Sequence, residues 1–481
     1  MKKDDSAELI QKKMFASVRK GHAVSGTIQI GATDLRFAGC AVVGALVWHI
    51  AASASAQDPP AQPKQQAATE DQESESDEAT TDASSGERFH FDPYNYETAF
   101  SIGEAETSPL VEMEEIDSEH TALFNIPFLD KPFDAATQGL DEFEQATALR
   151  IRFAYTMIFQ QASVGKSGGS GDMDFMSAWT LLGRGTANTG RLIVTGEYRH
   201  KMGDISANAL RDQIGTLQRT TGGFNDRGWV LREFNFIQRL YEGRLRFLIG
   251  RSDISDYFGA HRLQSINNSF SNRQFSANST TAFPNGHAIS GGVSVQPIDE
   301  LYITGGAANA YGQSNINDMS VLDEGDLFWA GEIGFTPTIE GLGPGRYAVF
   351  VWHMDARTLD NLPSDTGFSV IAEQNLNDLL HIFGRYGWAD DGTTGIKQAA
   401  EMGIGYRGLL GSPDNLTGAA IGISEPTAAG LRNEIVTEIF HRFQTTPYTQ
   451  LTFGLQGIFD PSNAPTEDAI AVFTTRFRIE F

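Results

Sequence analysis

The chain ends with residues 469–481, AIAVFTTRFRIEF, and the fold can be inferred outward from this stretch. One set of alternate residues is Phe473, Thr475, Phe477, Ile479 and Phe481. The other set is Thr474, Arg476, Arg478 and Glu480. This period of two predicts a β-strand with one apolar face and one charged face. The pattern suits a strand of a soluble β-sandwich, or a strand of a barrel whose apolar face meets lipid and whose charged face lines a wet lumen.

Composition narrows the class of protein. The 481 residues include 50 Gly and 32 Phe, and only 20% are charged. No apolar run outside the N-terminal region is long enough for a transmembrane helix, so a helical membrane protein is not expected. The net charge is −25, most of it within residues 57–146, and no basic patch stands out. Nucleic acid is therefore not expected as a partner.

Residues 1–56 are predicted to be a signal peptide. Basic residues precede a short apolar stretch, 37–50 (FAGCAVVGALVWHI), and the small residues Ala54-Ser55-Ala56 suit a cleavage site. The single cysteine, Cys40, lies in this segment, so the mature chain is expected to have no disulfide, thiolate metal site or cysteine nucleophile. Residues 57–130 are acidic, and the first part has almost no large apolar residue, which predicts a largely disordered extension.

Residues 131–481 differ from the preceding segment because they show repeated strand patterns. The pattern predicts sixteen strands near 147–162, 172–183, 190–200, 226–240, 244–254, 286–297, 300–312, 326–338, 345–356, 366–375, 379–390, 397–410, 415–426, 432–446, 449–460 and 468–481. The connections between predicted strands can be numbered along the chain. The even-numbered ones include the tight connections 241–243, 297–299, 411–414 and 447–448, and the odd-numbered ones include the long connections 201–225, 255–285 and 313–325. A sandwich does not require this asymmetry. We therefore predict an all-β, 16-stranded antiparallel transmembrane β-barrel with short periplasmic turns and long external loops.

Several motifs carry a resemblance to a known family. They are Gly250-Arg251 with Asp253, Asp256 and Tyr257; Gln264 with Asn267-Asn268; Gly331-Glu332; Gly345-Arg346-Tyr347; Glu373-Gln374; Phe383-Gly384-Arg385-Tyr386-Gly387; Glu434 with Glu438; and Gln456 with Asp460-Pro461. From about Phe133 to Phe481 the chain resembles the carbohydrate-selective porins (OprB type) of bacterial outer membranes. The terminal Phe481 also resembles the last residue of outer-membrane barrels. The acidic segment before Phe133 is not part of the family pattern.

The resemblance implies passive diffusion of mono- or disaccharides through an outer-membrane barrel. The expected partners are carbohydrate solutes, outer-membrane lipid and lipopolysaccharide, and the barrel-assembly machinery through Phe481. A short amphipathic helix over residues 133–145 is expected at the periplasmic mouth.

Alternation assigns a set of polar side chains to the lumen, independently of the family. They are Arg150, Arg152, Glu197, Arg199, Glu233, Asn235, Glu332, Glu373, Arg385, Glu401, Arg407, Glu434, Glu438, Arg442, Gln456, Arg476 and Arg478. Arginine has a planar fork of donors that pairs with carboxylates, so mixed Arg and Glu can form a network and still offer donors and acceptors to sugar hydroxyls. The alternative is that these charges only solvate the lumen and brace the wall.

The connection 255–285 is the candidate constriction loop. Its candidate residues are Tyr257, Phe258, Gln264, Asn267, Asn268, Phe270 and Asn272. Carboxamides match sugar hydroxyls, and aromatic rings can stack on the apolar face of a pyranose. The alternative is a surface loop packed over the rim.

The leading hypothesis is a sugar-selective porin. A general or anion-selective porin is the alternative within transport, but arginine and glutamate occur together along the lumen, which favours neutral solutes. A barrel-embedded hydrolase is the alternative from another class; His287, Ser290 and Asp299 form no convincing set. We predict no cofactor and no metal, because the loop acids Asp318, Asp323, Glu324 and Asp326 lack the spacing of a calcium loop.

Changing Phe481 to Asp, or removing it, should impair insertion, because a charge would replace the terminal aromatic residue of a lipid-facing strand. Outer-membrane levels measured by quantitative blotting check this. Normal levels of the variant would show that the face was assigned wrongly.

Overall fold

The structure, a computed structural model, describes residues 108–481 except 285–286 and 314–321. The predicted signal peptide and residues 57–107 of the predicted extension lie outside the described residues. Residues 108–130 are described and ordered: they contain helix α3 (Pro109–Asp117) and the start of helix α4 (Pro127–Thr147). The expectation of a largely disordered extension therefore does not hold for this part of it.

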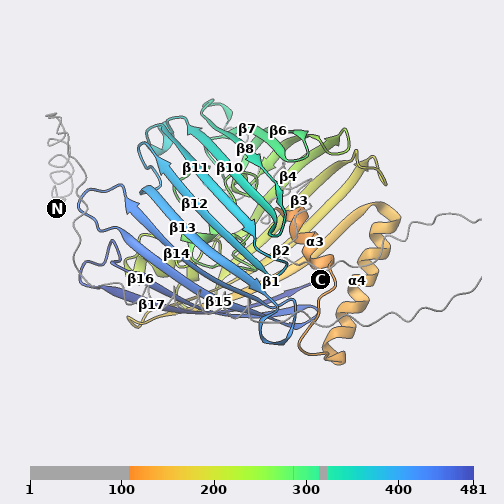
Figure 1. The fold of residues 1–481 in the computed structure, drawn as a ribbon, viewed down its shortest axis with the longest axis horizontal. Coiled ribbons are helices and arrows are strands. Elements are labelled where there is room, and N and C mark those ends of the chain that lie inside the picture. The colour runs from red at the N-terminus through yellow and green to blue at the C-terminus, as the bar shows by residue number, and fades with distance from the viewer. Residues whose placement is uncertain (1–107, 285–286, 314–321) are drawn as a thin grey trace, which may run out of the picture. The chain divides into compact units, whose positions relative to one another are not determined.

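The strands form one closed antiparallel sheet (Figure 1). They are β1 (Leu149–Ala162), β2 (Ser167–Leu182), β3 (Gly190–Lys201), β4 (Gly228–Leu240), β5 (Leu245–Ser252), β6 (Ala288–Ile298), β7 (Leu301–Asn309), β8 (Leu327–Phe335), β10 (Gly343–Met354), β11 (Asp365–Asn375), β12 (Leu380–Ala389), β13 (Ile396–Arg407), β14 (Leu416–Pro426), β15 (Glu434–Thr446), β16 (Thr449–Phe459) and β17 (Ala469–Glu480). The two-residue β9 (Thr338–Ile339) pairs only with the start of β10. Pairing of β1 with β17 closes the barrel, with Tyr155 opposite Ile479. The predicted 16-stranded fold is confirmed.

Alternation along β17 is as the sequence predicted. Thr474, Arg476 and Arg478 are buried inside the barrel, while Phe473 is 46% exposed on the outside. The outward apolar side chains form the surface that suits lipid, and the inward charged ones face the lumen. No helix in the described part of the chain is long and apolar enough to cross a membrane.

The turns at one end of the barrel are tight for a local reason. Tyr241 and Glu242, between β4 and β5, both have positive φ angles, as does the following Gly243. Two consecutive residues with positive φ favour a turn whose twist matches that of the flanking strands. The opposite end carries the long connections, which contain the short helices η1 (Ala207–Ala209), α5 (Leu210–Ile214), η2 (Ile254–Asp256), α6 (Arg273–Ser276) and η4 (Thr358–Asp360). Another short helix, η5 (Leu409–Gly411), lies in a connection at the tight-turn end.

Helix α4 lies at the tight-turn end and leads into β1 (Figure 1). It is longer than the predicted helix over residues 133–145, because Pro127 occupies a first-turn position and Asp130 accepts a hydrogen bond from the Ile126 amide at 2.7 Å. It ends at Ala148, which has a left-handed conformation and turns the chain into β1.

Phe481 contacts α4 and the first strand, β1, next to the place where β1 pairs with β17. Its backbone exchanges hydrogen bonds with Phe153 of β1 at 2.9 and 3.0 Å. Its ring lies 5.2 Å from that of Phe133 on α4 and 5.7 Å from that of Phe153. The terminal aromatic residue thus contacts both the first strand and the helix before it.

A glycine on β8 makes room for an inward aromatic ring. A Cβ at Gly334 would lie 2.1 Å from the Tyr302 ring of the neighbouring strand β7. The Tyr302 hydroxyl donates to Glu332 at 2.5 Å and accepts from Arg346 at 2.9 Å. The absence of a side chain at Gly334 therefore leaves room for Tyr302 to reach two charged groups of the lumen wall.

Gly334→Ala should lower the free energy of unfolding by about 1–3 kcal/mol, because the added methyl group would displace Tyr302 from Glu332 and Arg346. Chemical denaturation in detergent, followed by tryptophan fluorescence, measures this. Gly331→Ala on the same strand is the matched control, since its methyl group would meet nothing closer than 3.7 Å. Equal effects of the two variants would contradict the role of Gly334.

Candidate functional site

The structure places every predicted wall residue on the inner face. All are buried except Arg150 and Arg199, which are partly buried, whereas outward neighbours such as Phe234 and Met402 are 50% and 63% exposed. Their function in solute passage stays a prediction. Their contacts show that most of them hold other parts of the chain in the lumen.

The connection between β5 and β6 folds into the barrel and is held there by wall carboxylates. Glu438 accepts hydrogen bonds from the backbone amides of Ser271 and Asn272, both at 2.9 Å. Glu332 and Glu373 accept from the Gly259 and Arg262 amides in the same way. Hydrogen bonds to an ionised acceptor are roughly twice as strong as neutral ones, so these carboxylates fix the path of the loop.

Wall arginines bind the carbonyl groups of the same loop. Arg385 donates to Gly259 O at 2.9 Å and to Ala277 O at 2.6 Å, and it pairs with Glu401 at 2.6 Å. Arg346, Arg442 and Arg476 also donate to loop carbonyls. The loop segment 259–277 therefore has ionised partners for both its amides and its carbonyls.

The loop aromatic residues do not face open space. Phe270 packs against Phe383 and Phe440 of the wall, at centroid distances of 5.8 and 4.9 Å. Phe258 stacks on Phe350 at 5.8 Å. Phe258, Phe270 and also Tyr257 are at most 7% exposed. The expectation that these rings stack on a sugar does not fit this packing; they anchor the loop to the wall.

The connection between β3 and β4 also enters the lumen, which the sequence did not indicate. Glu434 accepts hydrogen bonds from the amides of Leu217 and Gln218 at 2.6 and 2.8 Å. Gln456 joins both loops, donating to Thr220 O at 2.8 Å and accepting from Asn272 at 2.9 Å. Glu434 and Gln456 were predicted to line the pore and instead support these loops.

Between the loops and the wall lies a cavity of about 570 Å³. Predicted residues that line it are Glu197, Arg199, Gln264 and Asn267. Residues that sequence reasoning had not assigned to it include Asp172, Arg232, Asp253, Asp256, His287, Arg219 and Arg273. This cavity is the candidate solute site.

Arg232 was missed because a β-bulge breaks the alternation. Thr195 of β3 lies opposite Glu233, but the next residue, Gly196, lies opposite Leu231, so the pairing skips Arg232. The extra residue turns inward beside Glu233. Arg232 donates to Asp256 at 2.5 Å and pairs with Glu197 at 3.2 Å. A bulge depends on tertiary pairing and leaves no clear mark in the alternation.

Arg346 could have been assigned to the lumen from the sequence, because it lies on the opposite face from the outward residues Tyr347 and Val349.

Two groups of charged side chains line the cavity. Burial by itself would raise the pKa of Asp253, but a hydrogen bond from His287 and the charge of Arg232 hold this pKa below its usual range. In the inward-folded connections, burial and the neighbouring Arg219 and Arg211 lower the pKa of Arg273 to about 10. One group therefore consists of paired charges and the other of neighbouring arginines.

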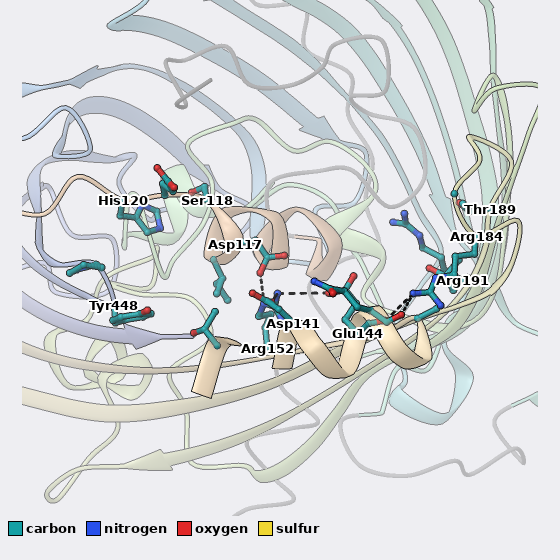
Figure 2. Close-up of a pocket in the computed structure, with 18 of the residues that line it drawn as sticks. Asp117, Ser118, His120, Asp141, Glu144, Arg152, Arg184, Thr189, Arg191 and Tyr448 are labelled. Atoms are coloured by element: carbon teal, nitrogen blue, oxygen red, sulfur yellow. Dashed lines mark hydrogen bonds and ion pairs between the residues drawn. The ribbon is translucent and has the colours of Figure 1, made fainter. Parts of the chain in front are cut away.

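A second cavity, of about 870 Å³, lies at the tight-turn end, between α3, α4 and the wall (Figure 2). Arg152 of β1 reaches into it and contacts Asp117 of α3 and Asp141 of α4, the latter at 2.7 Å. Tyr448, in the β15–β16 turn, donates to Asp134 at 2.6 Å, and burial raises the Tyr448 pKa to about 12. The tight-turn end is thus narrowed by two helices.

The residues considered for a hydrolytic or metal centre have other partners in the structure. His287 pairs with Asp253 at 3.4 Å, Ser290 donates to a backbone carbonyl, and Asp299 contacts Arg244. The acids Asp172, Asp174 and Glu197 have oxygen atoms within 4.8 Å of one another, but Arg199 contacts two of them. A protein cation therefore already lies where a metal ion would bind. Asp318 of the predicted acidic loop lies outside the described residues.

A closed 16-stranded barrel with inward-folded external loops defines a porin-type channel protein of the bacterial outer membrane. The profile of the family described as "Carbohydrate-selective porin, OprB family" matches residues 203–481, and the chain belongs to that family. The resemblance that the sequence motifs suggested is confirmed.

Individual relatives are more distant. Porin AaxA of Chlamydia abortus is 25% identical over 267 residues, which are 53% of this chain and 59% of that protein. Porin AaxA of Chlamydia muridarum is 23% identical over 278 residues, again 59% of that protein. The chain thus matches less than two thirds of the length of these relatives. The high-pH structure of Pseudomonas putida OprB has a TM-score of 0.58 at 15% identity, covering 71% of this chain and 96% of that one, which shows a shared fold.

Glu438→Ala should loosen the tip of the constriction loop, because the Ser271 and Asn272 amides would lose their ionised acceptor, at a cost of about 1–3 kcal/mol for each unsatisfied group. Hydrogen exchange of residues 265–275 should become faster. Glu467→Ala, in an external connection, is the control for loss of one carboxylate. Unchanged exchange in the Glu438 variant would contradict the anchoring role.

Proposed function

We propose that the protein is an outer-membrane porin through which neutral, hydroxyl-rich solutes of monosaccharide size diffuse passively. The observation that carries this proposal is the lining of the 570 Å³ cavity, which combines paired carboxylates and guanidinium groups with uncharged carboxamides. Membership of a carbohydrate-selective family supports the same class of solute.

The wall charges of the cavity are compensated within it. Arg199 contacts Glu197 and lies 3.3 Å from Asp172, while Arg232 lies 2.5 Å from Asp256. A paired guanidinium and carboxylate present little net charge to an ion, yet each retains donors or lone pairs that a hydroxyl group can use. Neutral solutes therefore exchange water for hydrogen bonds at low net cost.

The loop side offers carboxamides from Gln264, Asn267 and Asn278. Carboxamides donate and accept, so they match the mixed donor and acceptor pattern of sugar hydroxyls. Passage needs contacts weak enough for the solute to leave, and a wet cavity with single hydrogen bonds meets that condition. Selection would then depend on polarity and size rather than on one tight site.

An anion-selective porin is the second candidate, and one observation favours it. Arg211, Arg219 and Arg273, from the β3–β4 and β5–β6 connections, line the same cavity. Burial and the adjacent Arg211 lower the pKa of Arg219, which indicates cations close together. Such a group would raise the local concentration of anions in the cavity.

Proteoliposome swelling with three solutes of nearly equal size decides between these candidates. Glucose should enter faster than gluconate and faster than glucosamine, because the charged solutes lose hydration in a cavity of little net charge. Protein-free liposomes give the background. Fastest entry of gluconate would support the anion porin, and equal entry of all three would support a general porin; either result contradicts the sugar-selective proposal.

A further inference from the structure

The lumen wall contains an apolar patch that a wet pore does not require. Met176 and Ala178 of β2, Ile193 of β3 and Ala154 of β1 all face inward and are at most 5% exposed. Inward positions of large porin barrels are usually polar because they meet water. With Leu110 and Met113 of α3 they belong to a larger apolar cluster that continues to Tyr257 and Phe258 of the constriction loop.

Three wall arginines, on β15, β17 and β1, bind the carboxylates of α3 beside this patch. Arg478 donates to Glu112 at 2.7 Å, Arg442 pairs with Glu115 at 3.4 Å, and Arg152 contacts Asp117. These arginines were predicted to line the pore. The α3 carboxylates that they bind come from a segment that precedes the family pattern and the family match.

Helix α3 depends on this site for its structure. Ser108 caps its N-terminus, with its hydroxyl 3.5 Å from the Val111 amide, and Pro109 occupies the first turn. A helix of nine residues is marginal by itself in water, so contacts with the wall must supply most of its stability. Glu115 also accepts a hydrogen bond from Asn268 of the constriction loop at 2.8 Å, which links the helix to the loop.

The two cavities meet α3 at opposite ends. Glu112, in its first turn, lines the 570 Å³ cavity, whereas Ile116 and Asp117, in its last turn, line the 870 Å³ cavity. The two cavities share no lining residue. Helix α3 thus has one cavity at its first turn and the other at its last turn.

We propose that the apolar patch and the three arginines Arg152, Arg442 and Arg478 form a docking site for an acidic helix, and that α3 occupies it as a plug which closes the pore until it is displaced. This inference rests on the proposed porin function. It assigns Glu112, Glu115 and Asp117 as the residues that set the open fraction.

Single-channel recording in planar bilayers tests the plug with the full chain. The variant Glu112→Gln/Glu115→Gln keeps side-chain shape and removes two charges that bind wall arginines. Each charged hydrogen bond lost should shift the ratio of open to closed time on the order of tenfold. Glu114→Gln is the matched control, because it neutralises one carboxylate on the exposed side of the same helix.

A second pair of variants gives an independent readout. Deletion of residues 57–107 keeps α3, and deletion of residues 57–117 removes it. The shorter deletion should conduct like the full chain, and the longer one should remain open throughout the recording. Heat-modifiable migration on a gel confirms that each barrel is folded; if the double variant fails this check, the deletions decide.

The outcomes separate the two proposals. Greater open time in the double variant and the longer deletion, but not in Glu114→Gln, supports the plug. Equal conductance of the full chain and the folded longer deletion overturns the plug and leaves the porin function in place. If the folded longer deletion passes no ions at all, the porin function itself is wrong, and the plug fails with it.

Discussion

Hydrogen bonds between ionised wall residues and the main chain of an irregular loop are the interaction on which the lumen depends. A loop that enters a barrel loses water around many of its amides and carbonyls, and each buried group needs a partner. Strand residues such as Glu438 and Arg385 supply those partners. Because the partners are charged and fixed on rigid strands, a segment with little regular structure has one path through the lumen.

These contacts give most charged side chains of the barrel wall a structural role. Buried carboxylates and guanidinium groups require compensation, and the loops provide it together with opposite charges. The charges that remain beside the 570 Å³ cavity are those of β2 to β4, near the bulge at Arg232, and those of the external connections. The proposed solute path therefore runs beside β2 to β4, whereas most of the other predicted wall residues make structural contacts.

The same compensation extends to the tight-turn end. Arg152 meets both α3 and α4, so one side chain links the two helices to the first strand. Phe481 contacts α4 and the same strand, which places the chain's last residue at this junction. The mouth of the barrel is thus built from segments at both ends of the described chain.

The sequence by itself determined the strands, their number and their inner and outer faces. A period of two needs only local chemistry, so Arg476 and Phe473 could be assigned to opposite faces without any contact information. Tight turns and long connections likewise fixed which end carries the loops. The helix before β1 was expected because its pattern is also local.

Only the tertiary structure decided what the inward side chains bind. The alternation around Arg478 is the same whether its side chain contacts water, a sugar or Glu112. The sequence does not indicate Glu112 as a partner, because Glu112 lies far away along the chain. The bulge at Arg232 depends on pairing between two strands, and the inward turn of the aromatic ring of Phe270 depends on a pocket made by β12 and β15. Local sequence patterns determine whether a side chain points inward or outward. Long-range packing determines which groups the inward side chains bind. Those partners decide which charged side chains stabilise the structure and which remain available to a solute.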